Sequence, residues 1–431
     1  MSTSTSRLSV LCLATWLTLC LPTAAHAQTQ APATADDQYR LGLYQRETGE
    51  PYSAIDTLES LLSSYPTLNR ARMELAVAYY RTLNYERARA EAERVLNDHT
   101  TPEMVRLSVS SFLKQLELEQ AMTLGKPHRF EFSTSLGLMY DSNVNAGPDS
   151  ALLGSSLAGD LVLDPEFTAK SDWGYIAQLG VQHTWQSPKP LRVGQATGRF
   201  SWNSSLSLYQ KAYHQFNEQD LGVISLATGP ALIVGNGWRG NLNVQFDKIT
   251  LGGHDLGLYT SVNPSGTWRL GSGGELTADV QWVKRDFTRN LDSGRDSQYQ
   301  SVGLSYGQLM GNQTWSLQGG LRLFNESARD ARFSNQGEEY FVGARANVVG
   351  IDLFARAAWR HSRHLGIEPV YGMSRRETER RTEIGASHNF NEGWLDKWQL
   401  TGTVSHVHNK ANLSLYGYDR DTVTIALNRN F

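Results

Sequence analysis

The hydrophobic pattern of the chain changes its period close to residue 130. Between residues 36 and 124, apolar residues recur at intervals of three and four, which predicts amphipathic helices. From Phe130 onward, apolar and polar residues alternate. In WGYIAQLGVQHTW (173–185), one face is mostly aromatic and aliphatic, and the other is rich in glycine and glutamine. A period of two predicts β-strands that are apolar on one face, so the chain divides into a helical part and a strand-rich part.

Fourteen segments of the strand-rich part show this alternation. They span 129–140, 173–186, 191–211, 217–234, 238–250, 255–270, 275–289, 295–309, 313–325, 337–348, 351–364, 376–390, 397–409 and 416–431. Connections after even-numbered segments are short, whereas several after odd-numbered segments are long, at 141–172, 326–336 and 365–375. An even number of half-apolar strands with this alternation of connections predicts a 14-stranded antiparallel transmembrane β-barrel over residues 129–431.

The helical part repeats at an interval of 34 residues, which is the period of tetratricopeptide repeats. This interval separates Gly42 from Ala76, and Ala54 from Ala88. Small residues at such positions allow the two helices of a repeat to approach closely. A further helical stretch, 102–124, would cap the repeats or join them to the barrel. We therefore predict a tetratricopeptide-like domain over residues 36–124 and an α+β chain in two domains, with an ordinary pair of helical hairpins as the alternative.

The first 27 residues have the character of a secretory signal peptide, with an apolar run at 8–21 and small residues at 25–27. Residues 28–35 would then form a linker. Both cysteines, Cys12 and Cys20, fall in the predicted signal peptide, so the mature chain would form no disulfide and no thiolate metal site. A lipoprotein signal at Cys20 is the alternative, although the residues before Cys20 are not the small ones that such a signal requires.

The composition adds few constraints. The formal net charge is −3, and no cluster of basic residues resembles a nucleic-acid motif, so we predict no nucleic-acid partner. After the predicted signal peptide, no apolar run reaches the roughly 18–20 residues of a membrane-spanning helix.

The stretch MYDSNVNAGP (139–148) lies where the first predicted strand ends. Asp141, Asn143 and Asn145 recur at the alternate spacing of a calcium-binding loop, but Ala146 replaces the glycine that such a loop needs, and its final glutamate is missing. Asp and Asn also end strands by hydrogen-bonding their own backbone. We favour this second interpretation for the rim motif that runs from Tyr140 to Asn145. The long connection that follows would fold inward as a partial plug or lie outside the barrel.

Four further sets of residues are candidates for contacts. The concave side of the helical domain, where a client protein would bind, carries Arg46, Met73, Tyr80 and Arg81. A basic run near the outer rim, suited to the phosphates of lipopolysaccharide, carries Arg375, Arg376, Arg380 and Arg381. The apolar face of the last strand, a signal for the barrel-insertion machinery, carries Val423, Ile425, Leu427 and Phe431. Charges predicted to face the lumen include Glu131, Arg239, Asp247, Glu275, Asp279, Arg322, Arg356 and Arg360.

Three of these sets also have a plainer interpretation. The residues of the helical domain would pack between repeats, and the basic run would form a solvated ladder with neighbouring glutamates. The lumen charges would stiffen the wall, which we favour for any single residue, although they would also ease the passage of a polar chain. The histidines do not converge on a nucleophile, since His406 and His408 share a face whereas His361 and His364 lie on opposite faces. We therefore predict no enzyme activity, no cofactor and no metal site.

Taken together, these features resemble a known family. A signal peptide, tetratricopeptide helices, FSTSLGLMYDSNVNAGP at the start of a fourteen-stranded barrel and a closing YGYDRDTVTIALNRNF (416–431) are similar to the surface lipoprotein assembly modulators, the Slam family. The resemblance covers nearly all of the mature chain, although the helical part is shorter than in larger members. Known members are outer-membrane proteins that help move lipoproteins, and some soluble haem- or metal-acquisition proteins, to the cell surface.

The resemblance implies a protein of the Gram-negative outer membrane with its helical domain in the periplasm. Its expected partners are a client lipoprotein or secreted protein, the barrel-insertion machinery, and outer-membrane lipid and lipopolysaccharide. The predicted function is translocation of the client to the cell surface. The alternatives are a polysaccharide-export porin or a general solute porin. A sugar conduit should carry aromatic residues on its lumen face, whereas most tryptophans here (Trp173, Trp185, Trp238, Trp282, Trp359 and Trp398) are predicted to face lipid.

Overall fold

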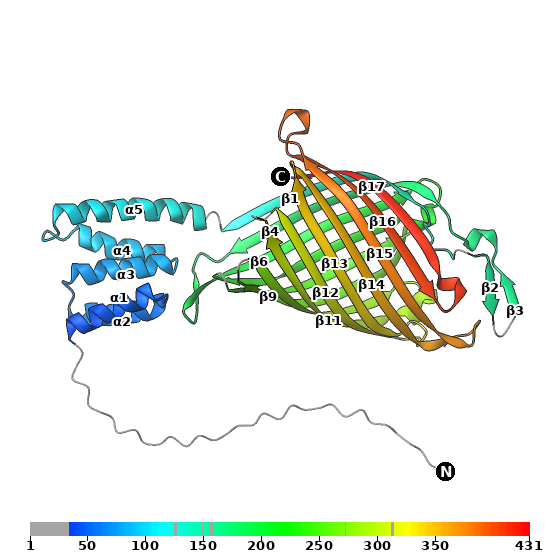
Figure 1. The fold of residues 1–431 in the computed structure, drawn as a ribbon, viewed down its shortest axis with the longest axis horizontal. Helices are drawn as coiled ribbons and strands as arrows, with labels where there is room; N and C mark the ends of the chain where they lie inside the picture. The colour runs from blue at the N-terminus through cyan, green and yellow to red at the C-terminus, as the bar shows by residue number, and fades with distance from the viewer. Residues whose placement is uncertain are drawn as a thin grey trace, which may run out of the picture.

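Five helices stack at one end of the molecule, and the strands that follow form one large barrel (Figure 1). The computed structural model describes residues 34–124, 127–148, 150–155, 159–235, 237–271, 273–311 and 314–431. The predicted signal peptide and nearly all of the predicted linker lie outside these residues. None of the described helices is long and apolar enough to cross a membrane. The end of the barrel beside the helices is called the proximal end below, and the opposite end is called the distal end.

The helical domain consists of two helical hairpins and one longer final helix. The helices are α1 (Ala35–Glu47), α2 (Pro51–Ser64), α3 (Asn69–Arg81), α4 (Tyr85–Leu96) and α5 (Glu103–Leu124). The small residues predicted to lie at close contacts do so, because Ala54, Ala76 and Ala88 are fully buried. A Cβ atom added at Gly42 of α1 would lie 2.7 Å from Cγ of Leu58 in α2. Residues separated by 34 positions therefore occupy equivalent packing positions in the two hairpins.

The final helix, α5, covers the end of the stack. Its Leu116 is fully buried in the core shared by α2, α3 and α4, and Val109 packs beside Ala92 and Val95 of α4. The opposite face of α5 exposes Met104 and other apolar residues to solvent. Because β1 begins only four residues after α5 ends, this helix both caps the stack and leads into the barrel.

Fourteen antiparallel strands close into the barrel. They are β1 (His128–Asp141), β4 (Asp172–Gln186), β6 (Ala196–Tyr213), β7 (Leu221–Val234), β8 (Trp238–Leu251), β9 (His254–Leu270), β10 (Gly274–Phe287), β11 (Ser297–Met310), β12 (Trp315–Ala328), β13 (Asn335–Val348), β14 (Ile351–Glu368), β15 (Met373–Asn389), β16 (Trp398–Ala411) and β17 (Tyr418–Asn430). Each pairs with its neighbours in the chain, and β1 pairs with β17. The predicted fold class, a helical domain followed by a closed 14-stranded barrel, is confirmed.

One predicted strand is divided in the structure. The alternating segment 191–211 turns at Gly194, whose φ of 62° lies in the left-handed region. Its first residues form the short strand β5 (Leu191–Val193), which folds back on the start of β6. The resulting hairpin lies at the proximal rim.

The seam between the first and last strands is shorter than the joint on the other side of β1. Nine residues of β1, from Ser133 to Asp141, are in register with β17, whereas all fourteen residues of β1 are in register with β4. Backbone hydrogen bonds between Phe132 and Phe431 extend the seam by one step, with lengths of 3.3 and 2.8 Å. The barrel is therefore closed, and the proximal end of β1 projects beyond its last partner.

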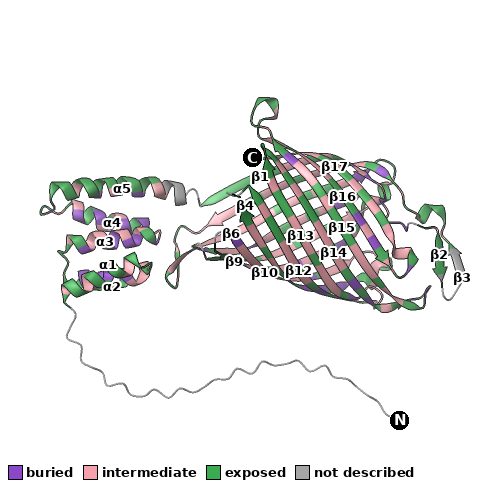
Figure 2. Cartoon of the chain, viewed as in Figure 1, coloured by how far each residue is buried: buried purple, intermediate pink, exposed green. Residues whose placement is uncertain are grey.

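Exposed and partly buried residues alternate along the strands (Figure 2). On β1, Phe132, Leu136 and Leu138 are more than half exposed on the outer wall. The alternate residues, such as Ser135 and Met139, point inward and meet inward residues of the neighbouring strands. The outer wall is thus apolar along the middle of the strands, which is the property that a lipid-facing barrel requires.

The connections differ at the two ends of the barrel. The longest is distal and contains a hairpin of β2 (Leu152–Ser155) and β3 (Gly159–Val162), which stands beyond the distal rim (Figure 1). The hairpin therefore occupies the outer of the two placements considered above. One connection departs from the predicted pattern, since the proximal connection at 390–397 is longer than the other proximal turns.

The helical domain contacts the proximal rim through the β5–β6 hairpin. The guanidinium of Arg192 lies 3.1 Å from the carboxylate of Asp56 in α2 and 4.8 Å from the ring centre of Tyr52. Gln195 donates to the hydroxyl of Ser53 over 2.7 Å and accepts from the Ser53 backbone over 3.3 Å. The bent third strand therefore provides the contact between the two domains.

Candidate functional site

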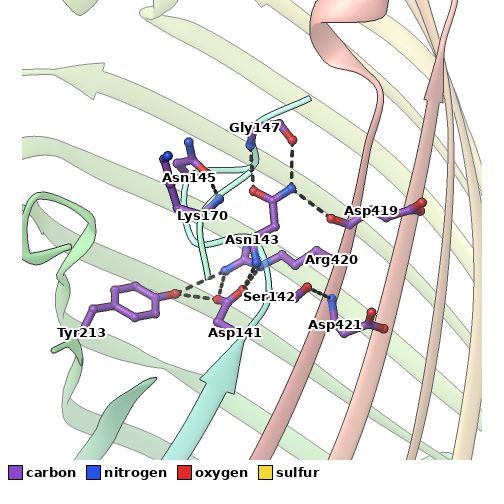
Figure 3. A network of polar contacts seen from close by, with 10 residues as sticks. All are labelled: Asp141, Ser142, Asn143, Asn145, Gly147, Lys170, Tyr213, Asp419, Arg420 and Asp421. Carbon is purple, nitrogen blue, oxygen red and sulfur yellow. Dashed lines mark hydrogen bonds and ion pairs between the residues drawn. The ribbon is translucent and has the colours of Figure 1, made fainter. Parts of the chain in front are cut away.

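The rim motif forms a buried polar network across the seam of the barrel (Figure 3). Asp141 ends β1 with its side chain 1% exposed, and Arg420 of β17 binds both of its carboxylate oxygens over 2.9 and 2.5 Å. The hydroxyl of Tyr213, from β6, donates to the same carboxylate over 2.6 Å. Three strands are thus joined by one buried carboxylate. The guanidinium and the phenol hydroxyl compensate the carboxylate for the loss of water around it, so that its charge can be buried on the inner wall.

Asn143 and Asn145 fasten the start of the long distal connection. The Asn143 amide donates to the backbone carbonyls of Gly147 and Asp419, each over 2.9 Å, and accepts from the Gly147 N–H over 2.8 Å. Asn145 donates to the Thr168 carbonyl and accepts from the Lys170 N–H. The two ends of the connection are therefore held together directly above the seam. The prediction that Asp and Asn end the strand by bonding nearby backbone agrees with these contacts.

The calcium alternative finds no support in this geometry. The side-chain oxygens of Asp141, Asn143 and Asn145 that a cation would need each accept a hydrogen bond from the protein. The left-handed position in the loop is Ala146, with φ of 50°. Within the described ranges, no group of three or more His, Cys, Asp or Glu side chains could hold a metal ion.

Two members of the network, Tyr213 and Arg420, were not predicted from the sequence. Arg420 lies within the closing stretch YGYDRDTV, and the ring closure of a barrel brings the last strand beside the first. The signal for Arg420 was therefore present, since a charged residue of β17 at the distal rim must lie near the end of β1. Tyr213 had no comparable signal, because nothing in the local pattern indicates which phenol reaches Asp141.

The four candidate client-binding residues all make contacts inside the helical domain. Arg46 is 15% exposed and lies 2.9 Å from Glu74, while Arg81 donates to the Arg46 carbonyl. Met73 packs against the buried cluster that α4 and α5 share. A hydrogen bond to Glu119, together with burial, raises the pKa of Tyr80 to about 12. Binding of a client by these residues stays a prediction.

The basic run near the distal rim is divided between the two walls. Arg376 and Arg380 point outward and are exposed. Arg375 points inward, lies 3.4 Å from Glu377 and stacks on the ring of Tyr416 at 4.0 Å. Arg381 also points inward and lies 3.0 Å from Glu379. Contact with lipopolysaccharide therefore stays a prediction for Arg376 and Arg380, whereas Arg375 and Arg381 are paired with acids.

The lumen wall carries ion pairs that reach across an intervening strand. Arg322 of β12 lies 2.9 Å from Asp279 of β10, passing over Gly303 of β11, where a Cβ would meet both side chains. Arg239 and Glu275 form a similar pair at 2.7 Å near the proximal end. Pairs of this kind agree with the interpretation that single lumen charges stiffen the wall.

Other predicted lumen charges are also engaged. Glu131 lies 3.0 Å from Arg129, and Asp247 accepts from Gln245. Arg356 stacks on Phe341 at 4.6 Å, and Arg360 stacks on Phe324 at 4.1 Å. Phenylalanine and tyrosine rings therefore do line part of the lumen, although Trp359 and Trp398 point outward.

The histidines are dispersed over both walls. His406 and His408 point outward and lie 2.8 and 2.6 Å from Asp421 and Asp419. His364 points inward beside Arg375. One G-x-S-x-G pattern occurs, at 303–307, but it lies in the middle of β11 and not at the sharp strand-to-helix turn that exposes a nucleophile. The arrangement therefore offers no catalytic geometry among the described residues.

The apolar face of the last strand points toward lipid. Val423, Ile425 and Phe431 are between 39% and 62% exposed on the outer wall, and Leu427 shares their face. Arg429 interrupts this face but lies over the rings of Trp398 and Phe431, at 5.6 and 4.7 Å. The surface has the form expected of an insertion signal, and recognition by the insertion machinery stays a prediction.

The fold and its apolar outer wall define a membrane-spanning β-barrel protein with a tetratricopeptide-like helical domain. The tetratricopeptide repeat family matches residues 38–67, which correspond to most of α1 and all of α2. No curated protein matches the sequence.

Solved structures with a similar fold include several porins. An anion-selective porin from Comamonas acidovorans is 12% identical, with a TM-score of 0.36, and the match covers 70% of this chain and 99% of that one. OccAB4 from Acinetobacter baumannii is 10% identical, with a TM-score of 0.33 and coverages of 70% and 98%. OpdQ from Pseudomonas aeruginosa is 8% identical, with a TM-score of 0.35 and coverages of 71% and 98%. At these values the similarities carry no argument about function.

Proposed function

We propose that this protein is a translocation factor of the Gram-negative outer membrane that helps deliver a lipoprotein or secreted protein to the cell surface. The observation that carries the proposal is the contact between α2 and the β5–β6 hairpin. It holds a repeat domain, a type of domain that commonly binds other proteins, beside one mouth of a membrane barrel. A passive solute channel has no need of such a domain, whereas a machine that receives a client before passage does.

The connections support an orientation with the helical domain in the periplasm. The helical domain lies at the end where most connections are short, which is the periplasmic end of bacterial barrels. The long connection that the rim motif fastens would then face the cell exterior. A client captured in the periplasm would meet the helices first and the barrel second.

An exposed stripe on α5 supports the binding of a partner. Met104, Leu107 and Leu118 lie on one face of this helix and are 79%, 60% and 60% exposed. The last helix of a repeat stack normally has a polar outer face. Three large apolar side chains exposed on this face therefore favour contact with another polypeptide, and the client is the partner that we propose for them.

A porin for polysaccharide or small solutes is the second candidate. The observation that favours it is the set of Phe and Tyr rings on the lumen wall, among them Tyr259, Tyr299 and Phe324. Sugar rings stack on such surfaces. Arginines already lie over several of these rings, however, with Arg285 at 5.6 Å from the centre of Tyr259 and 5.3 Å from that of Tyr299. The exposed aromatic surface available to a sugar is therefore limited.

The proposal is tested by the surface exposure of tagged secreted proteins in intact cells. Protease treatment is compared between the parent strain, a deletion strain and the deletion strain that carries the wild-type copy. We expect at least one client to become protease-protected in the deletion strain while its total amount is unchanged, and the wild-type copy to restore its exposure. If every client stays exposed while extracellular polysaccharide or solute uptake falls, the porin replaces the translocation factor.

Exchange of the charges at the domain contact tests the observation itself. Arg192→Asp or Asp56→Arg alone should reduce client exposure, and the two together should restore it, because the ion pair is re-formed with its sign reversed. Each charge is about half exposed, so we expect a loss of no more than about 1 kcal/mol for the pair. The contact is monitored by disulfide formation between Ser53→Cys and Gln195→Cys. Cross-linking that is unaffected by the single exchanges would refute the role of this pair.

A further inference from the structure

The outer wall of β14 and β15 carries an uncompensated pair of arginines near the distal end. Arg363 and Arg376 are opposite each other in the register of the two strands, and both are exposed. Neither guanidinium has a hydrogen-bond or ion-pair partner in the part of the chain that the structure describes. The same holds for the guanidinium of Arg380, which lies on the same face of β15. Like charges directly opposite each other destabilise a strand pair. An anion placed between them removes this repulsion.

Two lysines elsewhere on the outer wall are paired with carboxylates of the protein. Lys248 of β8 lies 3.1 Å from Asp255 of β9. Lys284 and Asp286, both on the outward face of β10, are separated by 2.9 Å. These outward cations thus differ from Arg363, Arg376 and Arg380, whose guanidinium groups have no acidic partner among the described residues.

A groove of about 630 Å³ lies over the same strands. Its lining includes Arg363, Arg376 and His361, whose Nδ1 lies 3.1 Å from the hydroxyl of Thr378. At its other side the groove is lined by Leu323, which is 54% exposed. The groove thus joins a cationic part to an apolar part.

The groove lies where the outer wall changes from apolar to polar. Tyr340 of β13 and Trp359 of β14 are opposite each other one step closer to the middle of the strands, and both are outward and exposed. Aromatic residues of this kind mark the boundary between hydrocarbon and headgroups. The arginines therefore lie at the level of lipid headgroups, if the barrel spans the outer membrane as proposed above.

We propose that this groove binds a phosphorylated glycolipid of the outer leaflet. Its phosphate lies between the guanidinium forks of Arg363 and Arg376, which suit bidentate contact with phosphate oxygens, and an acyl chain lies along Leu323. Arg380 is four residues from Arg376, about 13 Å along the strand, and takes a second phosphate. The carboxylate of Glu338, which also lines the groove, opposes binding and limits its strength.

The experiment uses the purified full-length protein in nanodiscs of neutral lipid, so it does not depend on client delivery. Binding of bisphosphorylated lipid A is measured for the wild type and for the double variant Arg363→Gln, Arg376→Gln. We expect the double variant to bind about tenfold more weakly, because two charge-assisted contacts at an exposed site are lost. The matched control, Lys248→Gln with Lys284→Gln, removes two charges that are already paired and should leave the affinity unchanged. Glu338→Gln should increase the affinity.

Three results would overturn the proposal. The first is equal affinity of the double variant and the wild type, when both show the same shift of the folded barrel on unheated gels. The second is equally strong binding of lipid A from which both phosphates have been removed. The third is displacement of lipid A by an equal concentration of inorganic phosphate. This result would show that the site binds a free phosphate from water and not the headgroup of a membrane lipid. Tight binding of phosphorylated lipid A that requires both arginines supports it.

Discussion

Replacement of Arg420 by glutamine should weaken the distal part of the seam strongly. The substitution leaves the carboxylate of Asp141, 1% exposed, with only Tyr213 and a backbone N–H as donors. Removal of one partner from a buried ion pair costs about 3–5 kcal/mol. Arg420 is 27% exposed and the hydrogen bond from Tyr213 remains, so we expect a loss near the lower limit, about 3 kcal/mol.

The assay is urea unfolding of the purified protein in lipid vesicles, followed by tryptophan fluorescence. Asp421→Asn is the matched control, since Asp421 is a close neighbour on β17 but points outward, is 58% exposed and pairs with the exposed His406. It should cost less than about 1 kcal/mol. Asp141→Asn combined with Arg420→Gln should cost about 2 kcal/mol less than the sum of the single changes, because the two groups interact directly. An Arg420→Gln variant that loses no more than the control would refute the assigned role of the network.

The remaining predictions concern the helical domain and the end of the chain. Gly42→Leu should destabilise the helical domain by about 1–3 kcal/mol, because even a Cβ would lie 2.7 Å from Leu58. Unfolding followed by circular dichroism at 222 nm measures this loss. An unchanged unfolding midpoint would show that α1 and α2 can separate without cost. Hydrogen bonds to the carboxylate of Asp98, of which that from a backbone N–H of the following loop is the strongest, lower its pKa from 3.8 to about 2. The stability that these bonds provide is therefore complete above about pH 4 and is lost as the pH falls through 2. Asp98→Asn should remove this part of the pH dependence of helicity, and an acid titration identical to that of the wild type would contradict the prediction. Deletion of Phe431 removes two backbone hydrogen bonds to Phe132 and should cost about 1–3 kcal/mol. We expect a smaller fraction of the protein in membranes to be folded, as measured by its heat-modifiable migration on gels. An unchanged fraction would place the insertion signal elsewhere.

The barrel was largely predictable because each strand obeys one simple condition. A residue that faces lipid must be apolar and its neighbour need not be, so the alternation appears directly in the sequence. The condition fails at Gly194, where a tight turn interrupts β5 and β6 without interrupting the alternation. The odd or even position of a residue along a strand also predicts which wall it faces. Arg375 and Arg381 differ from Arg376 and Arg380 by an odd number of positions, so the division of this run between the walls could have been predicted.

The polar network could be predicted only in part, since it depends on the register of distant strands. Asp141 and Asn143 were identified from their own stretch of sequence, because their backbone contacts are local. The partners of Asp141 lie 72 and 279 positions away, in Tyr213 and Arg420. Pairing of the first and last strands follows from barrel closure, but the alignment that places these three side chains together does not. The free guanidinium of Arg363 was missed for the same reason, because its relation to Arg376 exists only across two strands.

The separation between Asp141 and Arg420 has a consequence for the order of assembly. Most strand pairs are hairpins whose ends lie a few tens of residues apart, whereas the seam joins residues 279 positions apart. Bringing such distant segments together costs about 2 kcal/mol more chain entropy than closing a loop of about 30 residues. We therefore expect the seam to form last, after β17 is complete. A chain that lacks its final strand cannot bury Asp141 against Arg420, so formation of this network reports that the whole barrel has been made.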